Sequence, residues 1–149
     1  MIKIVQGDIL NATENIICQQ VNCMGAMGSG LAKQIKNKYS QVYEEYMCYI
    51  KKHGSLKCLG SWQLITVESN KKIANLFGQY NYGRNRQQTD YDALYSGLQG
   101  VLKIAKEFKK SIAIPYGLGC GLAGGDWNIV FSIIEEIFED YDVTIYKLA

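Results

Sequence analysis

Short apolar runs rich in β-branched residues alternate along the chain with longer segments whose apolar residues recur every three or four positions. This alternation predicts strands joined by crossover helices, and therefore a largely parallel sheet. Six runs are expected to be strands: residues 2–6, 15–22, 62–67, 72–77, 111–115 and 143–148. The second run shows little alternation of apolar and polar residues, which predicts burial on both faces of the sheet.

Helical periodicity follows the second run and the fourth run. Residues 31–38 and 41–52 are expected to form two helices, and Gly54 is expected to end the later one. The strongest apolar stripe of the chain begins near Thr89, a predicted N-cap with Asp92 three residues later. This stripe predicts a long helix packed against the sheet.

The last helix is expected to begin after Asp126, which is a suitable N-cap, and to carry its apolar stripe as far as Phe138. The runs at 62–67 and 72–77 are separated only by the polar residues 68–71, and this short connection predicts a hairpin. The pattern as a whole predicts an α/β fold with a mixed, mostly parallel central sheet.

The length of 149 residues is typical of one domain, so residues 1–149 are expected to fold as a single unit. Apolar residues make up 48% of the chain and charged residues 20%, which excludes the composition of a disordered protein. The formal net charge of +2 is too small to predict a general attraction to nucleic acid or to membranes. Because there is no signal-peptide pattern and no apolar stretch of about 18 residues, we expect a cytoplasmic protein.

Thiol and imidazole groups are too sparse to predict a metal centre. No two of the five cysteines form a C-x-x-C pair, and His53 is the single histidine. We therefore expect reduced thiols, no metal ion and no other cofactor.

Two glycine-dense segments interrupt the pattern, at residues 25–30 and 117–125, each between the end of a strand and the start of a helix. Glycine lets a ligand approach the backbone closely, and the first N–H groups of a helix favour an anion such as phosphate. Either segment alone could equally be a tight turn. Five glycines in the nine residues of the second segment cost backbone entropy without an evident structural return, so the pair predicts a phosphate-binding site.

Common phosphate-binding motifs do not fit these segments. The first reads G-x-x-G-x-G instead of the G-x-G-x-x-G of dinucleotide-binding folds, and neither contains the lysine of a P-loop. Cys120 is not followed by an arginine that could clamp a phosphate, as a cysteine-dependent phosphatase would need. We interpret it as a small apolar residue.

Three motifs resemble the macrodomain family. Gly7-Asp8-Ile9 resembles that family's adenine-binding turn, and residues 21–32 (VNCMGAMGSGLA) and 115–127 (PYGLGCGLAGGDW) resemble its two ligand loops. The likeness extends from the first strand to the last and is greatest to the branch of the yeast-type ADP-ribose 1''-phosphate phosphatase and the terminal ADP-ribose protein glycohydrolase. It implies a three-layer α/β/α macrodomain and, as ligands, ADP-ribose, ADP-ribose 1''-phosphate or ADP-ribosylated macromolecules.

The resemblance also implies roles for individual residues. Asp8 would accept a hydrogen bond from the adenine amine, Asn22 would bind the distal ribose, and Tyr146 would stack on adenine. Each also has an ordinary structural interpretation, as an Asx turn, a loop-tying amide and a packed ring respectively. The implied ligand-binding set is Gly7, Asp8, Ile9, Asn22, Gly25, Ala26, Met27, Gly28, Ser29, Gly30, Pro115, Gly117, Leu118, Gly119, Cys120, Gly121, Leu122 and Tyr146.

Three positions depart from the catalytic pattern of that branch. Gln79 stands at the motif position of the glycohydrolase lysine, Ala123 at that of its partner aspartate, and Gln19 at that of the phosphatase's candidate histidine. A neutral amide cannot form the lysine adduct, which disfavours lysine-dependent glycohydrolysis. Any hydrolysis is expected to use a positioned water, with Asn22, Gln79 or Asp126 as catalytic helpers, although a cap carboxylate is expected to be a weak base.

The tyrosine-rich segment after the fourth run contains Arg84, which could meet a terminal phosphate by a forked hydrogen bond or could be an ordinary solvated charge. Three functions remain open. The favoured one is hydrolysis of ADP-ribose 1''-phosphate, or of an ADP-ribosyl group by a route without lysine. The others are a non-catalytic reader of ADP-ribose and an unrelated α/β protein with another phosphate ligand. The motifs specify the ligand class better than turnover.

Overall fold

The computed structural model of the chain describes residues 1–148 and contains one six-stranded sheet. Its strands are β1 (Ile2–Gln6), β2 (Ile16–Gln20), β3 (Trp62–Glu68), β4 (Lys71–Leu76), β5 (Ile112–Pro115) and β6 (Val143–Lys147). Its helices are the short 3-10 helix η1 (Ile9–Asn11), α1 (Gly30–Lys38), α2 (Ser40–His53), α3 (Ser55–Cys58), α4 (Tyr91–Phe108) and α5 (Trp127–Ile137). The strand order is β1-β6-β5-β2-β4-β3, and only β3 and β4 pair antiparallel, which confirms the predicted mixed sheet.

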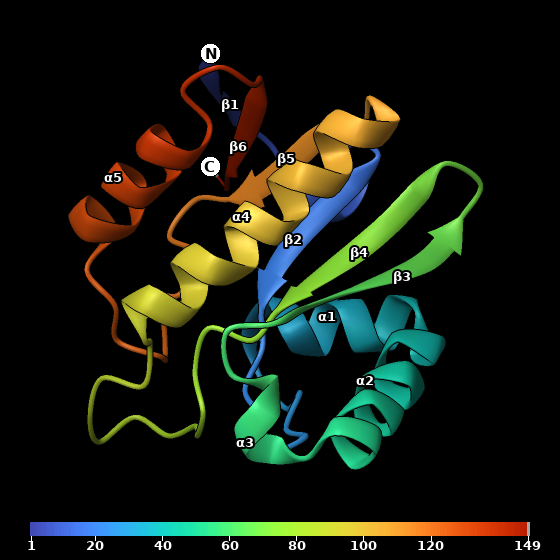
Figure 1. The fold of residues 1–149 in the computed structure, drawn as a ribbon, viewed down its shortest axis with the longest axis vertical. Coiled ribbons are helices and arrows are strands. Elements are labelled where there is room, and N and C mark those ends of the chain that lie inside the picture. Colours follow the sequence, from blue (N-terminus) through green and yellow to red (C-terminus); the bar gives the residue numbers. More distant parts are fainter. Residues whose placement is uncertain (149) are drawn as a thin grey trace.

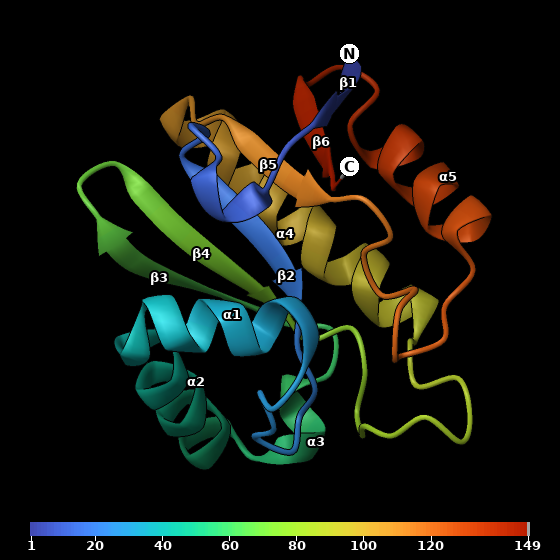
Figure 2. The ribbon, with the colours of Figure 1, turned by 180° about the vertical axis from the view of Figure 1, so that it is seen from behind.

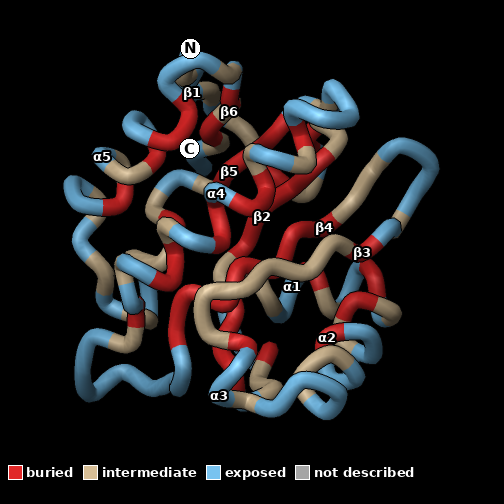
Figure 3. Tube along the Cα trace, viewed as in Figure 1, coloured by how far each residue is buried: buried red, intermediate tan, exposed pale blue. Residues whose placement is uncertain are grey.

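Two helical layers cover the sheet, with α4 and α5 on one face and α1 and α2 on the other (Figure 1 and Figure 2). Alternate residues of β2 serve the two layers. Ile16 and Cys18 join the core beneath α4 and α5, whereas Ile17 joins the core beneath α1 and α2. The central strands are therefore buried on both faces, while the outer loops are exposed (Figure 3). The fold is the expected three-layer α/β/α arrangement.

Several predicted boundaries are confirmed. Strands β3 and β4 form the hairpin, Gly54 ends α2, and the Asp126 carboxylate caps α5 by accepting a hydrogen bond from the N–H of Asn128. Helices η1 and α3 were not predicted, because three and four residues are too few to show a helical period. Among residues 1–148, no helix has both the length and the apolar character needed to cross a membrane.

The predicted N-cap of α4 is wrong by one residue. Asp90, and not Thr89, caps the helix, because its carboxylate accepts a hydrogen bond from the N–H of Ala93 at 3.0 Å. The Thr89 hydroxyl instead donates to the carbonyl oxygen of Gly119 at 2.6 Å and accepts from the Gln20 amide at 3.0 Å. These tertiary contacts occupy the hydroxyl that a local cap would need.

Replacing Asp90 with alanine is expected to lower the free energy of unfolding by about 1 kcal/mol, the usual contribution of an N-cap side chain. Asp90→Asn should retain most of the stability, because the amide oxygen accepts the same hydrogen bond. Urea denaturation followed by circular dichroism measures both variants. An Asp90→Ala variant as stable as the native protein would show that this carboxylate does not stabilise α4.

The carboxyl ends of the five parallel strands lie along one edge of the sheet. After β2 the chain passes to α1 on one face, and after β5 it passes to α5 on the opposite face (Figure 1). Because β2 and β5 are neighbours, the chain diverges between them. Ligands of open α/β sheets bind at such a point, and the two glycine-dense segments follow these two strands.

Candidate functional site

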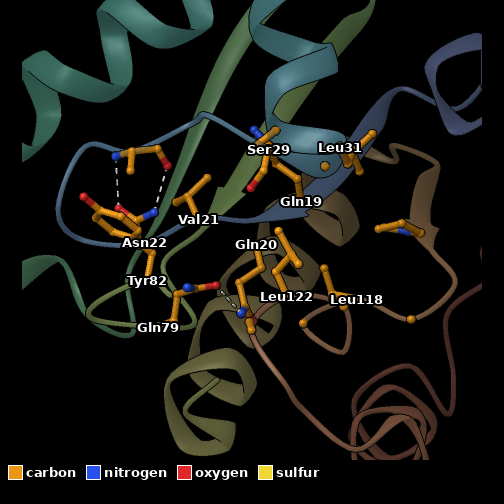
Figure 4. A pocket seen from close by; sticks show the side chains of 18 of the residues that line it. Gln19, Gln20, Val21, Asn22, Ser29, Leu31, Gln79, Tyr82, Leu118 and Leu122 are labelled. Carbon is orange, nitrogen blue, oxygen red and sulfur yellow. Dashed lines mark hydrogen bonds between the residues drawn. The ribbon is translucent and has the colours of Figure 1, made fainter. Parts of the chain in front are cut away.

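A cavity of about 550 Å³ lies between the loops that follow β2 and β5. Ser29 and Leu31 lie on one side of it, and Leu118 and Leu122 lie on the other (Figure 4). Its lining residues are Gln19, Gln20, Val21, Asn22, Ala26, Gly28, Ser29, Gly30, Leu31, Ala32, Gln79, Tyr82, Gly83, Arg84, Pro115, Tyr116, Gly117, Leu118, Gly119, Gly121, Leu122 and Ala123. The fold thus brings both glycine-dense segments together with the segment after β4.

The first loop leads into the N-terminus of α1, where no side chain provides a capping hydrogen bond. The backbone N–H groups of a first helical turn have no intrahelical partner, and Gly30, Leu31 and Ala32 of this turn line the cavity. Gly28 also lines it, and a Cβ built on Gly28 would meet no atom within 4 Å. This open helix end favours an anion through its N–H donors and its dipole.

The second loop depends on glycine for its backbone conformation. Gly117 and Gly119 have φ angles of 81° and 72°, in the left-handed region that other residues adopt at a cost. The carbonyl oxygen of Gly119 accepts hydrogen bonds from the Thr89 hydroxyl at 2.6 Å and from the Gly125 N–H at 2.9 Å. These contacts tie the loop to the start of α4 and hold it beside the cavity.

Asn22 ties the first loop together and also lines the cavity. Its Oδ1 accepts hydrogen bonds from the N–H groups of Met24 and Ala26, and its Nδ2 donates to the carbonyl oxygen of Ala26. The Tyr46 hydroxyl lies within hydrogen-bond distance of both the backbone carbonyl oxygen and the Oδ1 of Asn22. An amide nitrogen carries two hydrogens, and the bond to Ala26 uses one of them. Holding the loop therefore uses one of the two N–H groups of the Asn22 amide and leaves the other for a ligand.

Gln79 belongs to a network at the floor of the cavity. Its Oε1 accepts from Nε2 of Gln20 at 2.8 Å (Figure 4), and its Nε2 donates to the carbonyl oxygen of Asn81 at 2.8 Å. The Gln20 side chain lies so close to Gly78 and Gly119 that an added Cβ would approach its Oε1 to 2.4 and 2.7 Å. Gln79 thus helps to hold the cavity walls, with one N–H of its amide unused.

A ladder of amide side chains, buried at Gln19 and Asn75 and half-buried at Gln63, runs from the cavity to α2 across three strands. Gln19 donates from Nε2 to Oδ1 of Asn75 at 2.7 Å, Asn75 donates from Nδ2 to Oε1 of Gln63 at 3.1 Å, and Gln63 donates from Nε2 to the carbonyl oxygen of Glu45 at 2.9 Å. These side chains meet because Gln19, Asn75 and Gln63 are register partners on β2, β4 and β3. The last acceptor is a backbone carbonyl, which cannot donate, so it fixes the orientation of every amide. The Oε1 of Gln19 is left without a partner among residues 1–148.

The residues assigned to adenine lie beside the cavity and not in its lining. One oxygen of Asp8 accepts from the N–H of Leu10, which is the Asx-turn interpretation, and the other remains free to accept from a ligand. The Tyr146 ring lies against Gly7, and its hydroxyl donates to the Glu14 carboxylate at 2.6 Å. Tyr146 pairs in register with Pro115, which lines the cavity, so this group occupies the adjoining part of the edge. Ile9 is buried in the core.

Four other predicted site residues are absent from the cavity lining: Gly25, Met27, Cys120 and Asp126. Met27 is buried in the core beneath α1 and α2, and the Asp126 carboxylate is occupied in capping α5. Burial, and then the nearby Asp126 carboxylate, raise the pKa of the Cys120 thiol to about 11. This thiol is protonated at neutral pH and is a poor nucleophile. No cluster of three or more His, Cys, Asp or Glu side chains within residues 1–148 is arranged to hold a metal ion.

The structure adds lining residues that the predicted ligand-binding set did not include, among them Gln20, Tyr82 and Tyr116. One signal was present in the sequence, because Gln19 and Gln20 place two amides at the end of an otherwise apolar run. A buried amide pair beside a ligand loop indicates a hydrogen-bonding role. Tyr82 and Tyr116 lie in loops, where no hydrophobic periodicity predicts which side chains point into the cavity.

Comparison with known proteins relates this site to others. A family model described as the Macro domain matches residues 18–134. The DNA ADP-ribosyl glycohydrolase of Mycobacterium tuberculosis is 30% identical over 98% of this chain, which spans only 42% of that relative's length. The ADP-ribose 1''-phosphate phosphatase of Saccharomyces cerevisiae is 23% identical over 99% of this chain and 98% of its own.

The likeness extends to three dimensions. The solved structure of the macrodomain of Mycobacterium tuberculosis DarG superposes with a TM-score of 0.81, at 27% identity, over 98% of this chain and 97% of that one. The matched family model covers most of the chain and both glycine-dense loops. The chain therefore belongs to the Macro domain family.

Proposed function

We propose that this protein binds ADP-ribose or a close derivative in the cavity between its two glycine-dense loops, and that it hydrolyses ADP-ribose 1''-phosphate slowly. The observation that carries the proposal is the uncapped N-terminus of α1, which opens on a cavity lined by no carboxylate among the described residues. This setting suits a diphosphate. The names of the two relatives, a glycohydrolase and a phosphatase, share the ADP-ribose group.

The strand order suggests how such a ligand would lie. Adenine would occupy the β1 and β6 end of the edge, where the free oxygen of Asp8 faces the amine and the Tyr146 ring offers a stacking surface. The diphosphate would lie between the loops after β5 and β2. The distal ribose would then reach the unused N–H of Asn22, on the side of β4.

The chemistry available at the distal end is limited. A water oxygen would attack phosphorus of the 1''-phosphate, the bond from phosphorus to the 1'' oxygen would break, and ADP-ribose would leave with a proton taken from water. Loop N–H groups would stabilise the added negative charge, and Asn22 would hold the ribose. No lining residue is a strong base or nucleophile, so a modest rate is expected.

The lack of a strong base or nucleophile among the described lining residues favours a second candidate function. Gln79 offers no amine, Ala123 no carboxylate and Gln19 no imidazole, so the site resembles a binding pocket without catalytic side chains. The second candidate is therefore a reader that binds ADP-ribose groups without turnover. The name of the mycobacterial relative adds DNA-linked ADP-ribose to the substrates worth testing, by a route without lysine.

Calorimetric titration with ADP-ribose and with AMP tests the binding proposal. We expect ADP-ribose to bind at least about tenfold more tightly, since a diphosphate engages more of the N–H donors than a monophosphate does. Equal affinities would contradict the diphosphate cradle. Release of inorganic phosphate from ADP-ribose 1''-phosphate then separates the two functions, because a reader binds but releases none.

A further inference from the structure

The charges that line the cavity are unevenly distributed. Arg84 is the only residue in the lining with a charged side chain at neutral pH, and no aspartate, glutamate or lysine of residues 1–148 joins it. The remaining polar groups are amides, hydroxyls and backbone. A lone guanidinium in such a cavity favours an anionic part of the ligand and has no neighbouring carboxylate in the lining to neutralise it.

The position of Arg84 in the fold indicates which end of a bound ligand this charge would meet. Arg84 follows β4, whereas the residues assigned to adenine follow β1 or lie in β6, at the other end of the parallel set. The two glycine-dense loops lie between these ends. The segment that carries Arg84 runs from beside the first loop to the second loop, where the N–H of Gln88 donates to the carbonyl oxygen of Ala123 at 2.7 Å. In the proposed orientation of the ligand, the distal ribose at Asn22 lies beside the start of this segment.

The segment after β4 is anchored to the first loop near this end. The N–H of Cys23 donates to the carbonyl oxygen of Tyr80 at 3.0 Å, which fixes the start of the segment next to Asn22. Arg84 itself is exposed and makes no hydrogen bond or ion pair within residues 1–148, so its five N–H donors are free. Arg86 is also exposed but does not line the cavity.

We propose that Arg84 is the specificity-determining residue for an anionic group on the 1'' carbon of the distal ribose, and that it makes the protein prefer ADP-ribose 1''-phosphate to ADP-ribose. The proposal rests on the proposed function, because it assumes that ADP-ribose lies in the cavity in the stated direction. A guanidinium matches a phosphate with two parallel hydrogen bonds, a geometry that a lysine ammonium cannot reproduce.

The experiment compares the affinities of both ligands in the native protein, Arg84→Gln, Arg84→Lys and the matched control Arg86→Gln. Affinity is measured by competition against a fluorescent ADP-ribose, within a time shorter than one turnover. In Arg84→Gln we expect the preference for the 1''-phosphate to fall about tenfold, the loss of a charged hydrogen-bonding partner. The affinity for ADP-ribose should stay nearly constant.

Arg84→Lys should retain part of the preference and show a steeper loss on adding salt, because a point charge is screened more than a forked pair. Arg86→Gln should behave as the native protein. An unchanged preference in Arg84→Gln, or an equal loss in Arg86→Gln, would overturn the assignment of Arg84 alone. A native protein that binds neither ligand would instead overturn the proposed function. Thermal unfolding of each variant verifies that the fold is intact.

Discussion

Replacing Gly28 with glutamate is expected to abolish binding of ADP-ribose and to leave the fold intact. Gly28 lines the cavity, and a Cβ built on it meets no atom within 4 Å. Its φ angle lies outside the left-handed region, so a side chain is tolerated there without backbone strain. The new carboxylate would stand beside the N-terminus of α1, where the diphosphate is proposed to bind.

The expected loss follows from like-charge repulsion. Two unit charges about 4 Å apart near a protein surface repel by roughly 4 kcal/mol, which corresponds to a loss of affinity of at least about a hundredfold after screening. Gly28→Gln is the matched control, because it has nearly the same size without the charge, and it should bind more tightly than the glutamate variant. Calorimetry measures both. Normal binding by Gly28→Glu would exclude the first loop as the diphosphate site.

The second large effect concerns stability. Gly100 lies on the face of α4 that packs against β3, and a Cβ built on it would stand 2.4 to 2.5 Å from three ring atoms of Trp62. A flat, rigid ring cannot give way as a flexible chain end can. Gly100→Ala is therefore expected to cost about 3 kcal/mol in overpacking, of which about 1 kcal/mol is offset by the better helix propensity of alanine.

Gly97 of the same helix provides the control. An added Cβ there would meet Leu76 and the carbonyl oxygen of Ser61 at 3.4 Å, the edge of ordinary contact. Gly97→Ala should therefore be close to neutral or slightly stabilising, whereas Gly100→Ala should lower Tm by about 6 °C. Thermal unfolding followed by circular dichroism distinguishes them. Equal Tm values for the two variants would show that Trp62 does not restrict Gly100.

The sequence pattern was sufficient for the architecture because each strand and each of the longer helices carries its own signal. The run around Ile17 lacks alternation, since both faces of β2 are buried, and the short polar connection between β3 and β4 permits only a hairpin. The two glycine-dense loops were also recognisable, because their position after strands places them at the carboxyl edge. These features are local, and local sequence specifies them.

Other features depend on contacts between distant segments, which no local pattern contains. Thr89 fails as an N-cap because Gly119 and Gln20 engage its hydroxyl. The amide of Asn22 is largely used in holding its own loop, and Gln79 is bound to Gln20, so neither side chain is as free as its motif position suggested. Their proposed roles toward a ligand remain predictions.

The amide ladder between α2 and the cavity restricts what chemistry position 19 can support. Asn75 presents an oxygen to that position because Gln63 beyond it must donate to a carbonyl of α2. A histidine in place of Gln19 would have to donate one ring N–H to this oxygen, which would fix its tautomer and leave its other nitrogen unprotonated. A histidine base at position 19 would then be oriented by the backbone of α2, through the side chains of Asn75 and Gln63. The scaffold for such a base is present in this chain, although an amide now occupies the position.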